Sequence, residues 1–256
     1  MLVVKIGGNV IDDAAALETF LADFARLEGP KVLVHGGGKL ATRLSARLGI
    51  ETRMVDGRRV TDAETLDVAV MTYAGLTNKR IVAALAAQGQ PAVGLCGADA
   101  GVVRSVRRSP VPVDFGFVGD VPADGVNTRF LLSLTQQGIA PVLCAITHDA
   151  RGQLLNTNAD SIASAVATAL AAVTPTSLVF CFEKPGVLRS VDDPASVIPR
   201  IDRPAFDRLK QEGVIAAGML PKLTGALAAV DSGVERVLIK SAADILNPAA
   251  GTAVCA

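Results

Sequence analysis

The sequence predicts an α/β fold: a three-layer αβα sandwich whose central sheet is mainly parallel. The first observation is a pair of apolar runs, at 2–6 and 31–35, whose valine and isoleucine residues favour an extended backbone. The second is that each run ends in glycines and is followed by a stretch with helical apolar spacing. Two strands joined through a helix run parallel and form a βαβ unit. The third is the lack of polar alternation in these runs, which is typical of strands buried on both faces.

The rest of the chain continues this alternation of strands and helices. Asp12 and Asp13 can cap a first helix at 14–24. The prolines and alternating apolar residues of 104–121 predict an antiparallel hairpin attached to the main sheet. The other expected helices are at 40–48, 63–73, 77–88, 127–137, 162–173, 204–211 and 223–232, and the other strands are at 92–95, 139–145, 178–182, 236–240 and, at an edge, 252–254.

Composition argues against several classes of function. The 25 basic and 25 acidic residues give no net charge, which argues against a nucleic-acid-binding surface. The opening residues are strand-like rather than leader-like, and the longest apolar helical run, 162–173, is too short to span a bilayer. The four cysteines are scattered without a Cys-x-x-Cys pair, and two histidines are too few for a zinc site, so no metal held by side chains is expected. We therefore expect a reduced, cytoplasmic protein with neither nucleic acid nor a membrane as partner.

Glycines follow both opening strands at the point where a ligand would bind. In open α/β sheets ligands lie beyond the carboxyl ends of the strands, so both glycine turns, Gly7-Gly8 and Gly37-Gly38, are expected along one crevice. Backbone N–H groups at such a turn bind phosphate. Lys5 stands just before the first turn and could bind that phosphate or simply reach solvent from the strand end. Neither turn matches a Walker loop or a dinucleotide fingerprint.

Three later segments contain candidate site residues. Lys222 lies in the first turn of a predicted helix, where the helix dipole disfavours a cation, and a bound anion would remove this conflict. The segment 156–161 is dense in small polar residues, of which N-capping would explain one or two but not all. Arg58-Arg59 follows a turn, where an arginine can bind a carboxylate or lie in a solvated loop.

Five motifs occur together in an order that resembles the acetylglutamate kinases of the amino acid kinase superfamily. The resemblance extends over nearly the whole chain and implies that superfamily's fold with two lobes. Residues 1–173 would bind the acyl amino acid and dimerise, and residues 174–256 would bind the nucleotide. The motifs are Lys5-Ile6-Gly7-Gly8, His35-Gly36-Gly37-Gly38, Gly57-Arg58-Arg59-Val60-Thr61, Asn156-Thr157-Asn158-Ala159-Asp160 and Gly218-Met219-Leu220-Pro221-Lys222.

The resemblance also implies a role for each matching residue. Lys5 and Lys222 would be the catalytic lysines, Asp160 would orient them, and Gly8 would bind the transferring phosphoryl group together with Gly37. The substrate-binding residues would be Gly37, Gly38, Arg59 and Asn156, and the nucleotide would lie by Glu183, Lys184, Gly186, Leu188, Val214, Ile215 and Ala216.

The chain departs from the family pattern in one segment near the expected nucleotide. It has Phe182-Glu183-Lys184-Pro185-Gly186, where the family usually has Thr/Ser-Asp-Val-x-Gly.

The implied reaction uses ATP with Mg²⁺ to phosphorylate the side-chain carboxylate of N-acetyl-L-glutamate, in arginine biosynthesis. A carboxylate is already ionised at neutral pH, so no general base is needed, and the lysines, glycine N–H groups and Mg²⁺ would offset the repulsion between two anions. The alternatives are N-succinyl-L-glutamate as the substrate, another amino acid kinase activity, and a metabolite sensor without turnover.

Two further expectations concern the acyl group of the substrate and the oligomeric state. A succinyl group adds a carboxylate, and the candidate cations for it are Arg58, Lys79, Arg104, Arg107 and Arg108. Arginine-responsive members of the family look hexameric and have an extra N-terminal helix. Because the first strand here begins at Leu2, we expect an arginine-insensitive homodimer.

Overall fold

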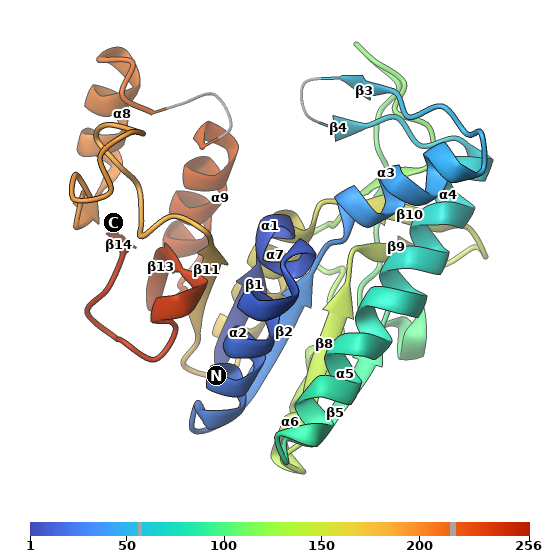
Figure 1. The fold of residues 1–256 in the computed structure, drawn as a ribbon, viewed down its shortest axis with the longest axis horizontal. Coiled ribbons are helices and arrows are strands. Elements are labelled where there is room, and N and C mark those ends of the chain that lie inside the picture. The colour runs from blue at the N-terminus through green and yellow to red at the C-terminus, as the bar shows by residue number, and fades with distance from the viewer. Residues whose placement is uncertain (56–57, 216–218) are drawn as a thin grey trace.

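A computed structural model of the chain describes residues 1–55, 58–215 and 219–256. Its central sheet has eight strands in the order β12-β14-β13-β11-β1-β2-β8-β5 (Figure 1). Neighbouring strands run parallel except for β13 and β14. The predicted α/β class with a mainly parallel sheet is therefore confirmed. The strands are β1 (Leu2–Ile6), β2 (Lys31–His35), β5 (Ala92–Leu95), β8 (Ala140–Cys144), β11 (Ser177–Phe182), β12 (Arg200–Ile201), β13 (Arg236–Ser241) and β14 (Thr252–Val254).

Helices cover both faces of this sheet (Figure 1). Val3 belongs to a core cluster with residues of α6, α7 and α9, whereas Val4 and Ile6 belong to another with residues of α2 and α5. Successive side chains of a strand point to opposite faces, so an apolar run such as β1 needs cover on both. The covering helices are α2 (Ala14–Arg26), α5 (Asn78–Ala87), α6 (Thr128–Gln136), α7 (Ala159–Ala171) and α9 (Leu220–Asp231).

The helices predicted at 63–73 and 77–88 are one continuous helix. α4 (Ala63–Ala69) runs into a π-helical segment, η1 (Val70–Thr77), which continues directly into α5. A glycine such as Gly75 weakens a helix, but three residues of this segment, Thr72, Tyr73 and Thr77, are buried. Tertiary packing of one helix face therefore maintains the helix where the local sequence suggested a break.

The hairpin predicted at 104–121 forms, but its expected attachment to the main sheet is wrong. β6 (Val106–Arg107) pairs antiparallel with β7 (Val118–Asp120), and β7 pairs parallel with β10 (Leu154–Thr157). With β9 (Ile146–His148) they form a separate sheet in the order β6-β7-β10-β9. The pairing of β7 with β10 joins segments that are distant in the chain, so local periodicity could not reveal it.

The strand expected at the sheet edge, 252–254, lies inside the sheet. β14 pairs with β13 on one side and with the two-residue strand β12 on the other. None of the helices within the described ranges is both long and apolar enough to cross a bilayer. The remaining elements are α1 (Gly8–Asp12), α3 (Gly38–Arg47), β3 (Met54–Val55), β4 (Arg58–Arg59), η2 (Asp99–Gly101), α8 (Arg203–Gln211) and η3 (Ala242–Asp244).

Candidate functional site

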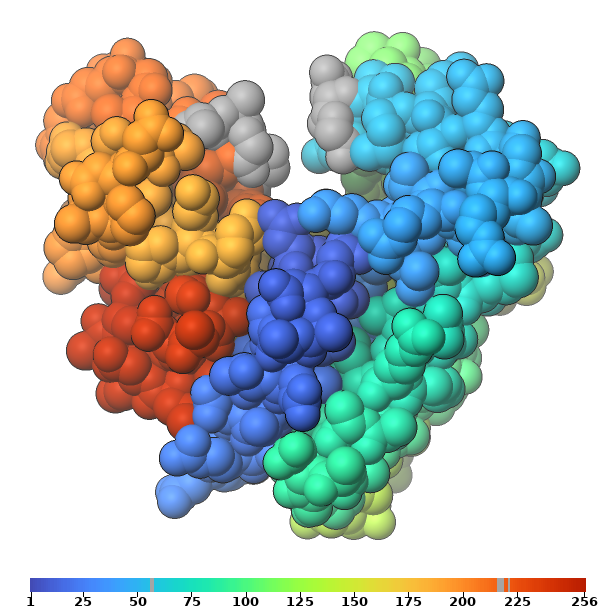
Figure 2. Space-filling view, in the orientation of Figure 1, coloured from blue at the N-terminus to red at the C-terminus, as the bar shows by residue number. Residues whose placement is uncertain are grey.

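Both glycine turns lie at the carboxyl-terminal edge of the central sheet, where its parallel strands β1 and β2 end. β1 and β2 are parallel neighbours, and Ile6 at the end of β1 is paired with His35 at the end of β2. The turns that follow them are therefore adjacent, and α1 and α3 begin directly at Gly8 and Gly38. In Figure 2, blue N-terminal residues lie at the base of a hollow between orange segments of the C-terminal half and cyan segments that follow α3.

Neighbouring side chains come close to both turns, at Gly7 and at Gly37, whereas Gly8 and Gly38 have open space beside them. A Cβ atom on Gly7 would lie 3.2 Å from Phe182 Cβ, and one on Gly37 would lie 2.8 Å from Tyr73 Cδ1. The second distance is well inside the normal separation of two carbon atoms. Glycine at 37 thus lets the backbone pass directly beneath the Tyr73 ring.

Lys5 and Asp160 form an ion pair at this edge. Lys5 Nζ lies 2.7 Å from Asp160 Oδ1, and the lysine is only 9% exposed. The contact meets the distance for an ion pair but not the angles of a hydrogen bond, and Oδ1 has no other partner within the described ranges. The alternative that Lys5 merely reaches solvent from the end of its strand is therefore wrong.

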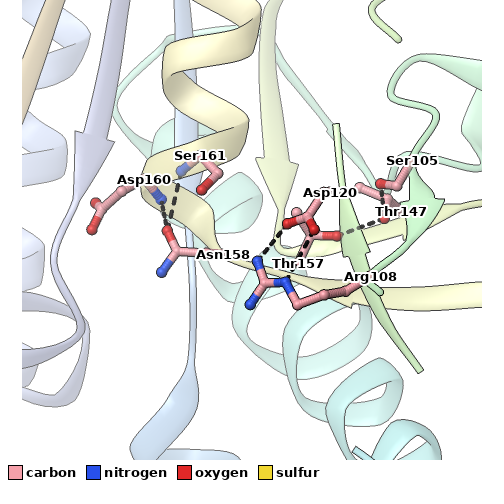
Figure 3. A network of polar contacts seen from close by, with 8 residues as sticks. All are labelled: Ser105, Arg108, Asp120, Thr147, Thr157, Asn158, Asp160 and Ser161. Carbon is pink, nitrogen blue, oxygen red and sulfur yellow. Dashed lines mark hydrogen bonds and ion pairs between the residues drawn. The ribbon is translucent and has the colours of Figure 1, made fainter. Parts of the chain in front are cut away.

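The polar segment 156–161 contains both structural residues and candidate site residues (Figure 3). Asn158 is the N-cap of α7, because its Oδ1 accepts hydrogen bonds from two N–H groups in the first turn, at 2.8 and 3.1 Å. The Thr157 hydroxyl lies 2.7 Å from the hydroxyl of Thr147 in a buried network. Capping and burial thus account for Asn158 and Thr157, and leave Asn156 and Asp160 as the candidate site residues.

Arg59 is buried and firmly held, so it is not part of a solvated loop. Its Nη2 donates to the carbonyl oxygen of Gly38 at 3.0 Å and to Thr42 Oγ1 at 2.8 Å. Thr61 Oγ1 donates to the Arg59 carbonyl oxygen, and Asn156 Nδ2 donates to Thr61 Oγ1 at 3.1 Å. Three of the predicted substrate-binding residues, Gly38, Arg59 and Asn156, are therefore linked in one chain of hydrogen bonds, whereas Arg58 is exposed.

Lys222 lies at the same edge through its contact with Phe182. Its Nζ is 4.8 Å from the centre of the Phe182 ring, a cation–π distance. Phe182 ends β11 and also approaches Gly7, as described above. The departure from the family pattern at position 182 therefore supplies an aromatic surface for the second predicted catalytic lysine.

Sequence reasoning missed a bridge of hydrogen bonds between the two halves of the chain. Lys39 Nζ donates to Asn9 Oδ1 at 2.5 Å, and Asn9 Nδ2 donates to Glu183 Oε1 at 2.8 Å. Lys39 lies in the first turn of α3, so the dipole argument that singled out Lys222 applies to it as well. The bridge connects α3, α1 and the end of β11, and only Glu183 had been predicted as a site residue.

The other residues predicted to lie by the nucleotide have different surroundings. Lys184 is exposed, whereas Leu188 and Ile215 are buried, with 8% and 6% exposure. Gly186 and Val214 are buried and half-buried respectively, and Ala216 lies outside the described residues. Their contact with a nucleotide stays a prediction. The part of the chain that the structure describes has no cluster of three or more His, Cys, Asp or Glu side chains suited to a metal ion.

Comparison with known proteins is consistent with this geometry. The acetylglutamate kinase of Phocaeicola vulgatus is 51% identical over 254 residues, which cover 99% of this chain and 98% of the relative. That of Parabacteroides distasonis is 53% identical over 245 residues, 96% of this chain and 95% of the relative. Among solved structures, smu.665 from Streptococcus mutans has a TM-score of 0.80 at 27% identity, and covers 99% of this chain and 98% of its own.

The family model described as "Amino acid kinase family" matches residues 1–241, which include both glycine turns, the Lys5–Asp160 pair, Arg59 and Lys222. The chain therefore belongs to the amino acid kinase family.

Proposed function

We propose that this chain transfers the γ-phosphoryl group of ATP to the side-chain carboxylate of N-acetyl-L-glutamate, giving N-acetyl-L-glutamyl 5-phosphate and ADP. It would thereby act in arginine biosynthesis, in the cytoplasm. The relatives named acetylglutamate kinase match it over nearly their whole lengths. The observation that carries the proposal is the convergence of both glycine turns, the Lys5–Asp160 pair and Arg59 at one edge of the sheet.

Phosphoryl transfer between two anions needs positive charge and N–H donors rather than a base. The acceptor carboxylate is ionised at neutral pH, so its attack requires no proton removal. Lys5 and Lys222 would stabilise the charge on the transferring group, and Gly8 and Gly37 would donate their backbone N–H groups to it. Asp160 would hold the Lys5 ammonium in place through their 2.7 Å contact.

Mg²⁺ would bind together with the nucleotide. This ion commonly retains several waters and binds through substrate phosphates with few protein ligands. We therefore assign the ion no side-chain ligand. When bound, it would neutralise part of the triphosphate charge.

Arg59 and Asn156 would hold the amino acid part of the substrate. Hydrogen bonds to Gly38, Thr42 and Thr52 fix the Arg59 guanidinium. A guanidinium held in one orientation is suited to a carboxylate, because its planar fork matches the two oxygens. Asn156 lies next to it through Thr61.

We further propose that residues 1–173 form the acyl-amino-acid-binding and dimerisation lobe and residues 174–256 the nucleotide-binding lobe, in a homodimer. Met71 and Leu76 on η1 are large apolar side chains with 51% and 42% exposure, which favours their burial against a second copy. Light scattering should give twice the 26.3 kDa chain mass, and Met71→Asp should shift it toward the monomer. A monomeric or hexameric wild type, or inhibition by millimolar arginine, would contradict this assembly.

One observation favours N-succinyl-L-glutamate as a second candidate substrate. Of the five basic residues considered for an extra carboxylate, Arg58 is exposed, and the Lys79 ammonium donates to the main-chain carbonyl oxygen of Gly94 on β5. Arg104 and Arg107 are paired with exposed aspartates. Arg108 is also paired with an aspartate, Asp120, but its side chain is the least exposed of these three arginines, at 18%.

Strand register places Arg108 on the same face of the small sheet as Asn156. The Arg108 N–H donates to the Val118 carbonyl oxygen, and Val118 is the register partner of Asn156. Cross-strand partners point to the same face of a sheet. β6 and β10 lie on either side of β7, and two strands that flank a third are about 10 Å apart. Asp120 holds the guanidinium through two hydrogen bonds, from Nη2 to Oδ1 and from Nε to Oδ2 at 3.0 Å (Figure 3), and no described group accepts from Nη1. Arg108 could therefore bind a carboxylate at the end of an acyl group.

ADP release with N-acetyl- and N-succinyl-L-glutamate side by side tests the proposal. If the acetyl compound is the substrate, its kcat/KM exceeds that of the succinyl compound, and Arg108→Leu changes it little. If the succinyl compound is turned over about tenfold more efficiently, the acetyl assignment is wrong. Arg108→Leu should then remove that preference, whereas the exposed neighbour Arg107→Leu, the matched control, should keep it. Binding of ATP without ADP release, with these and other amino acids, would favour a sensor.

A further inference from the structure

A buried histidine and asparagine lie behind the second glycine turn, and the proposed chemistry does not use them. His35, fully buried at the end of β2, has its Nδ1 atom 2.7 Å from the carbonyl oxygen of Gly36. A carbonyl oxygen only accepts, so Nδ1 must carry a proton. Asn78 Nδ2 lies 3.0 Å from His35 Nε2. Burial lowers the pKa of His35 to about 4, so the ring is neutral at physiological pH and Nε2 can accept from Asn78.

The orientation of Asn78 is fixed by its other contacts. Its Nδ2 also donates to the Val142 carbonyl oxygen at 2.9 Å, and its Oδ1 accepts from Lys79 Nζ at 3.1 Å. Turning the amide over would put Oδ1 against the Val142 oxygen and Nδ2 against an ammonium, so only one orientation satisfies all groups. The space for this arrangement exists because residue 94 is glycine, where a Cβ atom would lie 1.8 Å from Asn78 Oδ1.

The hydrogen bond on the Gly36 carbonyl has a geometric consequence for Gly37. The Gly36 C=O and the Gly37 N–H belong to one planar peptide unit, which is trans, so they point in opposite directions. A carbonyl that is held toward His35 therefore directs the Gly37 N–H away from it. This N–H has no main-chain acceptor among the described residues. Tyr73 packs against Gly37 from the same continuous helix that carries Asn78, which limits movement of the turn.

We infer that His35 and Asn78 are positioning residues that aim the Gly37 N–H at the phosphoryl group. Asn78 fixes the proton of His35 on Nδ1, and this proton fixes the peptide between Gly36 and Gly37. The inference rests on the proposed function, in which Gly37 donates to the transferring group. A hydrogen bond weakens steeply as its angle departs from linear, so a donor that is free to rotate loses much of its effect on the transition state.

Two substitutions of His35 form a matched pair. In His35→Asn, the amide nitrogen can take the place of Nδ1 and donate to Gly36, whereas in His35→Gln it replaces Nε2 and leaves that carbonyl without a donor. We expect His35→Gln to lower kcat by about tenfold or more, because one oriented donor is impaired, while KM stays within about threefold. His35→Asn should recover most of the kcat.

A control on the same segment separates positioning from stability. Thr72 on η1 is buried, and its hydroxyl donates only to carbonyl oxygens of its own helix, at 2.7 and 3.3 Å. Thr72→Val should lower the melting temperature and leave kcat unchanged. Equal kcat values in His35→Gln and His35→Asn, whether both normal or both impaired, would overturn the inference.

The tautomer of His35 can be read without measuring activity. The chain has only two histidines, so a nitrogen–proton correlation spectrum of labelled protein resolves both rings. We expect the His35 proton on Nδ1 in the wild type and a mixture of tautomers in Asn78→Ala. A proton on Nε2 in the wild type would refute the inference even if the His35 variants failed to fold. If the tautomer is as expected but no N-acylglutamate is phosphorylated, the proposed function is wrong, while the hydrogen bonds that hold the peptide between Gly36 and Gly37 stand.

Discussion

Acidification should destabilise this protein through His35, and the structure allows the size of the effect to be worked out. The pKa of this histidine falls from 6.5 to about 4 in the folded protein, first because burial penalises the charged ring. The hydrogen bond to Gly36 opposes this shift, and the positive charge of Lys79 adds to it. In the unfolded chain the ring regains its ordinary pKa of about 6.5.

The sign follows from which state binds the proton more readily. As the pH falls below 6.5, the unfolded chain takes up a proton that the folded protein accepts only near pH 4. The free energy of unfolding therefore decreases as the pH falls from 6.5 to 4, and the contribution of His35 is fully present above pH 6.5. Each pKa unit corresponds to about 1.4 kcal/mol, so the whole contribution is about 3 kcal/mol, of which about 2 kcal/mol is lost between pH 7 and pH 4.5.

Urea unfolding of the wild type and of His35→Gln at a series of pH values measures this contribution. Glutamine does not titrate, and every other ionisable group is common to both proteins, so the difference between their unfolding free energies isolates His35. The wild type should lose about 2 kcal/mol more than the variant on going from pH 7 to pH 4.5. Parallel curves for the two proteins would show that the buried ring does not titrate in this way and would refute the reasoning.

Three further predictions follow from the site and the core. Lys5→Ala and Lys222→Ala should each lower kcat by about 10²-fold or more, and steady-state ADP release with a near-normal rate would remove that lysine from catalysis. Gly37→Ala should lower kcat/KM by about tenfold or more, because its Cβ would meet Tyr73 Cδ1 at 2.8 Å, and a variant with normal kinetics would mean that the turn yields easily. Burial raises the pKa of the Cys144 and Cys181 thiols to about 12, so mass spectrometry after iodoacetamide at pH 8 should find them unmodified while the half-buried Cys255 reacts. Rapid modification of either buried thiol in folded protein would contradict this.

Local chemistry by itself determined the strand–glycine–helix units of this protein. The β-branched run before Gly7-Gly8 forms β1, and Asp13 caps α2 by accepting from the Ala16 N–H at 3.1 Å, as its place before a helical apolar pattern predicted. These features depend on neighbours a few residues apart, which a sequence displays directly. The parallel order of β1 and β2 followed as well, because a helix is the usual crossover between parallel strands.

Only the tertiary structure decided which side chains of those units meet. Local residue chemistry does not distinguish Arg59 from Arg58, and only the family resemblance singled out Arg59. In the structure Arg59 is buried against Gly38, whereas Arg58 is exposed. His35 and Asn78 are separated by 43 positions, and the contact between them depends on a helix that continues through Gly75. Periodicity describes which face of an element is apolar, but the partner of a buried polar group is set by how distant elements pack. Most such groups find a partner there, because an unpaired one costs about 1–3 kcal/mol.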